Sequence, residues 1–253
     1  MESALLLILT ILTWKNISKM YKPTSFRQLP EIIKNLLIIN GLLFFATISL
    51  NNYGIDLTKT LALHQFQSPN FRPHQIVTHF FMHADFTHLF FNMFALWMFG
   101  KTLENMWGAK RFLTYYIITA LGAAALHLAV SQFQIFQLID SKEVLELAKQ
   151  GMYNTSNLNS LRLLVTTPTV GASGAVFGIL LAFGYLFPNT LLYIYFAIPI
   201  KAKYFVMIYG ALELYSGLSN NPADNVAHFA HLGGMIFGYF LLKYWQKNNT
   251  QFY

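Results

Sequence analysis

The sequence contains no cysteine and very little charge. Without cysteine, neither disulfides nor thiolate chemistry can contribute to its structure or function. Only 11% of its 253 residues are charged, whereas soluble domains carry about 25%. Apolar residues make up 55% of the chain, and aromatic residues, which favour the two interfaces of a bilayer, make up 17%. This composition indicates a membrane protein rather than a soluble domain.

Six segments are apolar enough and long enough to cross a bilayer, which takes about 20 helical residues. They cover residues 35–55, 86–107, 112–132, 169–187, 202–218 and 225–245. The apolar run before the fifth segment is divided at Pro199 and Lys201, because ammonium groups are costly at mid-bilayer depth. Residues 191–200 are therefore expected to form a loop in or along the membrane face.

We accordingly expect an all-α fold, a polytopic membrane bundle of six transmembrane helices. One membrane domain, residues 35–245, accounts for most of the chain. Residues 1–34 precede it as a cytoplasmic or interfacial segment, in which the apolar stretch 4–14 is too short to span a bilayer. Residues 246–253 follow it as a short cytoplasmic tail.

The positive charges predict the orientation of this bundle. Of the 17 Lys and Arg residues, twelve fall on one side of the six segments and five on the other. The richer side is cytoplasmic by the positive-inside rule, so both termini face the cytoplasm. The basic residues that give the net charge of +7 stand between apolar runs. This placement reflects the orientation in the membrane, and we expect no nucleic-acid partner. The small size of the chain suggests a bacterial inner membrane. In one outer connection, residues 140–150 carry apolar side chains among charged ones, which suggests a short surface helix.

Polar side chains inside three of the segments occur at one depth. His88 and Asn92 lie in the second segment, Ser173 in the fourth, and His228 and His231 in the sixth. All three segments begin on the outer side, and at 1.5 Å per residue these side chains lie about 3 to 9 Å below it. Polar residues inside a membrane are costly unless they pair or face water, so this convergence predicts a functional site.

Small residues would bring the serine and one histidine together. The fourth and sixth segments each carry small residues four apart, a spacing that lets transmembrane helices approach to backbone contact. These glycines are Gly174 and Gly178 in one segment and Gly234 and Gly238 in the other. If the two faces meet, Ser173 and His231 lie at the outer end of the contact, where an imidazole could accept the hydroxyl proton.

The remaining polar groups suggest how such a pair would work. His88 and Asn92 are four residues apart on one helical face, so with the backbone N–H of Ser173 they could bind an oxyanion. We see no acidic residue at this depth, which predicts a Ser-His dyad rather than a triad. Phe177, one turn below Ser173, could stack on the imidazole in place of a carboxylate.

At these residues the sequence resembles the rhomboid intramembrane proteases. Gly171-Ala172-Ser173-Gly174 is similar to their G-x-S-G motif, and His231 with Gly234 and Gly238 is similar to their catalytic-histidine motif. The stretch from His83 through His88 to Asn92 resembles their H-x4-H-x3-N pattern. The likeness includes a Phe71-Arg72 pair in place of Trp-Arg and runs to about Tyr239.

The resemblance implies cleavage of other transmembrane helices near their outer ends, without metal or ATP. It implies Ser173 as nucleophile, His231 as base and His88 with Asn92 as oxyanion donors. Glu104 resembles a structural acidic position, and Phe177 stands where tyrosine is frequent. The spacing to Gly234 favours His231 over His228 as the base.

Each motif alone has an ordinary structural explanation. A serine in an apolar helix usually bonds to its own backbone, and a lone histidine usually packs, as we expect for His83 and His228 beside the site. Two other functions stay open: a rhomboid relative that binds membrane clients without cutting them, and a histidine-lined metal site. The sequence indicates neither the substrate nor the oligomeric state.

Overall fold

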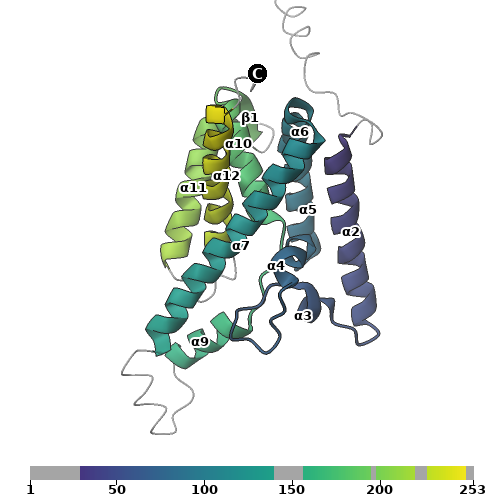
Figure 1. Cartoon of the computed structure of the whole chain (residues 1–253), viewed down its shortest axis with the longest axis vertical. Coiled ribbons are helices and arrows are strands. Elements are labelled where there is room, and N and C mark those ends of the chain that lie inside the picture. Colours follow the sequence, from purple (N-terminus) through teal and green to yellow (C-terminus); the bar gives the residue numbers. More distant parts are fainter. Residues whose placement is uncertain (1–28, 140–155, 195–197, 220–226, 249–253) are drawn as a thin grey trace, which may run out of the picture.

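The computed structural model describes residues 29–139, 156–194, 198–219 and 227–248, which form a bundle of long helices (Figure 1). The elements in chain order are α2 (Glu31–Asn51), α3 (Leu57–Leu61), α4 (Gln75–Thr78), η2 (His79–Phe81), α5 (Phe86–Ala95), η3 (Leu96–Gly100), α6 (Lys101–Trp107), α7 (Ala109–Ile139), α9 (Ser156–Thr166), α10 (Ser173–Leu186), β1 (Leu191–Ile194), β2 (Ile198–Lys201), α11 (Ala202–Ser219) and α12 (His228–Asn248).

Each of the six segments expected to span the membrane is helical over most of its length. Among the described residues, α2 and α7 are long and apolar enough to cross a membrane, and α10 is a shorter apolar helix. The fold is therefore mostly helical, as predicted, while the count of six crossings stays a prediction. Large apolar side chains such as Leu42 on α2, Tyr215 on α11 and Phe240 on α12 are more than half exposed, as a lipid-facing surface requires.

The second segment is one continuous rod made of α5, η3 and α6. It begins at Phe86 because Asp85 caps it, its side chain accepting the His88 backbone N–H at 2.8 Å. The π-helical turn η3 passes directly into α6. The rod ends at Gly108, whose φ of +78° favours glycine.

Helix α7 is the central packing element, which the sequence interpretation did not anticipate. In Figure 1 it crosses the bundle diagonally, and it packs against both α10 and α12. A Cβ added at Gly174 would meet Ala123 of α7, and one added at Gly178 would meet Thr119. A Cβ at Gly238 would likewise meet α7, at Tyr115.

The expected meeting of two glycine faces is therefore correct only in part. Gly234 does sit directly on the backbone of Gly174, where an added Cβ would overlap the Gly174 carbonyl. Gly178 and Gly238 instead accommodate side chains of α7, and Tyr115 donates its hydroxyl hydrogen to the Gly178 carbonyl at 2.9 Å. The physical reason is that α7 packs against both α10 and α12, and its side chains occupy the space beside Gly178 and Gly238.

The connections differ from the expectations in one further place. Residues 191–200 were expected to form a loop, but β1 and β2 pair antiparallel, with Leu191 opposite Lys201 and Ile194 opposite Ile198. Short apolar runs rich in β-branched and aromatic residues favour strands when they can pair. The outer connections contribute α3, α4 and α9, which gather at the lower end of the bundle in Figure 1. The predicted segments 4–14 and 140–150 lie outside the described residues.

Glu104 of α6 holds the start of α2. Its carboxylate accepts the backbone N–H groups of Ile32 at 2.8 Å and of Ile33 at 2.9 Å. These are among the N–H groups that a helix cannot satisfy internally at its first turn, so Glu104 caps α2 from a neighbouring helix. The structural role that the resemblance implies for Glu104 agrees with this contact.

Candidate active site

Ser173 is the first residue of α10, and the outer connections fix the chain that leads to it. Thr169 exchanges two backbone hydrogen bonds with Leu63, at 2.9 and 2.8 Å. The Gly171 N–H then donates to the His79 carbonyl at 3.0 Å. Gly171 has a φ of +121°, a backbone conformation that favours glycine, and so turns the extended chain into the helix at Ser173.

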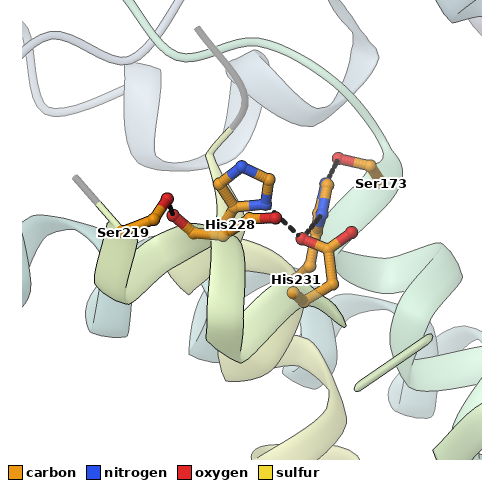
Figure 2. Close-up of polar contacts among 6 residues, drawn as sticks. Ser173, Ser219, His228 and His231 are labelled. Carbon is orange, nitrogen blue, oxygen red and sulfur yellow. Dashed lines mark hydrogen bonds and ion pairs between the residues drawn. The ribbon is translucent and has the colours of Figure 1, made fainter. Parts of the chain in front are cut away.

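His231 lies in the first turn of α12 and faces Ser173. Its Nε2 is 2.8 Å from the Ser173 Oγ, a distance at which the hydroxyl donates to the imidazole (Figure 2). Phe177 stacks on the ring with centroids 4.1 Å apart and planes within 6°. His231 itself is buried. The structure thus brings together Ser173, His231 and Phe177, as expected from the sequence.

The expectation that no acidic residue lies at this depth is wrong. Glu213 of α11 is buried, and its Oε2 lies 2.8 Å from Nδ1 of His231 and 2.6 Å from Nδ1 of His228. In the expected topology α11 runs outward, so depth is counted back from its last residue, Ser219. At 1.5 Å per residue Glu213 lies about 9 Å below that end, level with the histidines. Counting from the outer end of the fifth segment would have found it.

His88 also reaches the serine side of the site. A Cβ added at Gly171 would lie 2.7 Å from His88 Nε2 and 3.5 Å from Ser173 Oγ, so both atoms border the same point. The Ala84 backbone N–H donates to His88 Nδ1 at 3.5 Å, which leaves the hydrogen of the neutral ring on Nε2. That N–H therefore points to the region where an oxyanion would form.

Asn92 is less directly placed. Its Nδ2 donates to the His88 carbonyl one turn back, at 2.9 Å, and the side chain is buried. An amide has two N–H donors, so this bond occupies one of them. Asn92 thus braces the turn of α5 that carries His88.

The other histidines near the site are structural. His79 donates from Nδ1 to the Gln75 carbonyl at 2.8 Å, and burial lowers its pKa to about 4. His83 packs edge-on against His88 with ring centroids 5.1 Å apart, and burial lowers its pKa, too, to about 4. His127 Nε2 lies 2.8 Å from the Thr169 hydroxyl and so helps to hold the chain before Ser173. The rings of His79 and His83 are therefore neutral at physiological pH.

A small cavity adjoins the serine. Its lining combines polar groups from His79, Thr169 and Ser173 with the apolar Ala123 and Ala227. Polar lining is what a retained water molecule requires. The cavity therefore suits a hydrolytic site inside a helical bundle.

One group of side chains has the composition of a metal site. The ligand atoms of Glu213, His228 and His231 lie within 4.8 Å of one another. Two imidazole nitrogens and a carboxylate are ligands that zinc accepts. Here both nitrogens lie at hydrogen-bond distance from the same carboxylate oxygen, which satisfies these groups without an ion.

Comparison with known proteins agrees with this architecture. Mitochondrial rhomboid protein 1 of Saccharomyces cerevisiae is 28% identical over 68% of this chain and 42% of its own length. The mitochondrial RHOMBOID-like protein 12 of Arabidopsis thaliana is 28% identical over 81% of this chain and 55% of its own length. The rhomboid protease AarA of Providencia stuartii is 30% identical over 62% of this chain and 50% of its own length.

The chain thus spans about half the length of these curated relatives. Because two of them are named mitochondrial and one is bacterial, the expectation of a bacterial inner membrane is not supported. The family model of the rhomboid domain matches residues 70–247, a range that contains Ser173, His231 and Glu213. The chain belongs to the rhomboid family of integral membrane proteins.

Proposed function

We propose that this chain is an intramembrane serine endopeptidase, with Ser173 as nucleophile and His231 as general base. The observation that carries the proposal is the 2.8 Å contact between Ser173 Oγ and His231 Nε2. A serine hydroxyl is a weak nucleophile until an adjacent base accepts its proton, and this contact has the required geometry. Protease-named members of the family, from Bacillus subtilis and Providencia stuartii, support the same activity.

The reaction would follow the order of other serine proteases. The Ser173 hydroxyl gives its proton to Nε2 of His231 while Oγ attacks the scissile carbonyl carbon. The imidazolium then gives the proton to the leaving amine, which breaks the peptide bond. Water, activated by His231 in turn, hydrolyses the acyl-enzyme.

The negative charge that develops on the carbonyl oxygen needs donors. His88 offers Nε2–H beside Ser173, and Ser173 offers its own backbone N–H at the first turn of α10, where N–H groups lack helical partners. The dipole of α10 adds partial positive charge at the same place. Asn92 contributes to this site by bracing His88, and its second N–H is a further donor.

The substrates we propose are transmembrane helices, cut near their outer ends. The Ser-His contact lies about two turns or less from the outer ends of α10 and α12, inside a bundle whose outer surface is apolar. A substrate helix must expose an extended peptide bond to reach it, and this is easier close to a helix end than at mid-bilayer. The partners of the protein are then the lipid bilayer and membrane-protein substrates, without a cofactor.

The test compares cells that express the wild type with cells that express Ser173→Ala at equal level. Mass spectrometry of the medium or outer compartment should find membrane-protein ectodomains released by the wild type alone, with new termini near predicted span ends. Equal release by both forms would refute the proposal.

The cluster of Glu213, His228 and His231 favours one rival function, metal handling. A chelator separates the two, because a serine protease keeps its activity when divalent cations are removed. A non-catalytic client-binding relative is separated by the Ser173→Ala comparison itself, since client binding does not need the hydroxyl. Loss of function on chelation, restored by adding zinc, would favour the metal site.

A further inference from the structure

The base of the proposed pair has a buried carboxylate behind it. Glu213 Oε2 lies 2.8 Å from Nδ1 of His231, on the side of the ring opposite Ser173. The Glu213 and His231 side chains are 11% and 10% exposed. An ionised carboxylate at such a depth costs several kcal/mol unless hydrogen bonds compensate for the loss of water. Its placement therefore needs a reason beyond packing.

The carboxylate determines which ring nitrogen of His231 carries the hydrogen. An ionised carboxylate only accepts hydrogen bonds, so Nδ1 of His231 must be the N–H donor at 2.8 Å. Nε2 is then unprotonated, with its lone pair directed at the Ser173 hydroxyl. The opposite tautomer would place an N–H against the serine and could not accept its proton. Glu213 thus selects the productive form of the base.

Phe177 and Glu213 constrain the ring in different ways. The stack on Phe177, with planes within 6°, fixes the plane of the imidazole. Stacking does not distinguish the ring from the same ring turned over within that plane. The hydrogen bond to Glu213 supplies this distinction, and its negative charge also stabilises the imidazolium formed during proton transfer.

His228 anchors the carboxylate. Its Nδ1 lies 2.6 Å from the same Oε2 atom, so two N–H groups from one helix converge on one oxygen (Figure 2). Both histidines lie within the first turn of α12, three residues apart and on one face. The contact ties α11 to α12 at the depth of the site, and it gives His228 a role that sequence spacing alone did not.

We propose that Glu213 is a positioning residue that completes a Ser173–His231–Glu213 triad, with His228 holding the carboxylate in place. This inference rests on the proposed protease function and deepens it, because a triad was not expected from the sequence. Glu213 orients the base and balances its charge without touching the substrate.

The test measures proteolysis in proteoliposomes containing a model transmembrane substrate, at several pH values, for the wild type, Ser173→Ala and Glu213→Gln. We expect Glu213→Gln to lower turnover by about 100- to 10,000-fold, since a glutamine N–H can impose the wrong tautomer. The acid limb of the pH profile should also move to lower pH, because protonated His231 loses its anionic partner. A purely structural role would lower activity without moving this limb.

Three further variants control the test. Glu213→Asp keeps the charge and should leave the acid limb at the wild-type pH. Glu104→Gln removes a buried carboxylate that accepts the first N–H groups of α2 and is no partner of His231 in the described contacts, so its pH profile should match the wild type. Where Glu213→Gln does not fold, Glu213→Leu replaces it, because an apolar side chain is well tolerated in a buried membrane site.

The outcomes separate this inference from the function on which it rests. Wild-type protein without Ser173-dependent cleavage would overturn the protease function. Ser173-dependent cleavage with a wild-type rate and pH profile in Glu213→Gln or Glu213→Leu would overturn the triad alone. A large loss of rate together with the shifted acid limb supports the triad.

Discussion

Substituting Gly171 by alanine tests the oxyanion side of the site. The new Cβ would lie 2.7 Å from His88 Nε2 and 2.8 Å from its Cε1, closer than real Cβ contacts allow. Either the His88 ring or the chain before Ser173 must move. The φ of +121° adds backbone strain of about 1 to 3 kcal/mol. Loss of one oxyanion donor typically lowers turnover by about 100- to 1,000-fold.

Gly54 provides the matched control. It too has a positive φ, +77°, but a Cβ added there meets nothing within 4 Å. Gly54→Ala should therefore cost about 1 to 2 kcal/mol of stability through backbone strain and leave turnover unchanged. The comparison separates strain from displacement of His88.

The assay is turnover of a model transmembrane substrate per folded enzyme, with thermal unfolding in detergent measured in parallel. We expect Gly171→Ala to lose turnover far beyond its loss of stability. In a His88→Ala background the same substitution should cost little more turnover, since both changes remove one donor. Wild-type turnover in Gly171→Ala would refute the placement of His88 at the oxyanion.

Three other predictions follow from the packing around the site. Gly234→Ala should abolish activity and destabilise the protein, because its new Cβ would overlap the backbone of α10. The control Gly41→Ala has open space around its Cβ, so thermal unfolding should show it to be neutral or stabilising by about 0.5 to 1 kcal/mol. Phe177→Tyr should keep most of the turnover and Phe177→Leu should lose it, because only the former preserves the stacked ring on His231; equal rates would show that the stack is dispensable. The buried His79, with its pKa lowered to about 4, is protonated more readily in the unfolded chain, so its contribution to stability is complete above pH 6.5 and is lost as the pH falls toward 4. His79→Gln should flatten this pH dependence of the unfolding temperature, and an unchanged slope would contradict the assignment.

Hydropathy predicted the positions of the long helices because each apolar run must satisfy its backbone internally. Hydropathy could not predict the pairing of β1 with β2. A short apolar run such as residues 191–200 is compatible with either helix or strand, and the pairing of the two strands depends on tertiary structure. Hydropathy also missed the central place of α7. Small residues around Ala123 allow another helix to approach closely, but the sequence does not say which helix does so.

The site was predictable where depth alone decides the outcome. Ser173 and His231 both lie in the first turn of their helices, so counting residues from the expected outer ends of those helices placed them at the same depth. Glu213 was overlooked because α11 runs in the opposite direction and its outer end is its last residue. The bond from Asn92 to the His88 carbonyl depends on a rotamer, which spacing along a helix does not determine.

The most direct test of the account is the identity of the residue that a fluorophosphonate modifies in the folded, membrane-reconstituted protein. Peptide mass spectrometry should find the phosphonyl adduct on Ser173, and the adduct should persist with a chelator present and disappear in His231→Ala protein of wild-type unfolding temperature. An adduct on another residue, or labelling of Ser173 at an unchanged rate in His231→Ala, would contradict the Ser173–His231 pair as nucleophile and base.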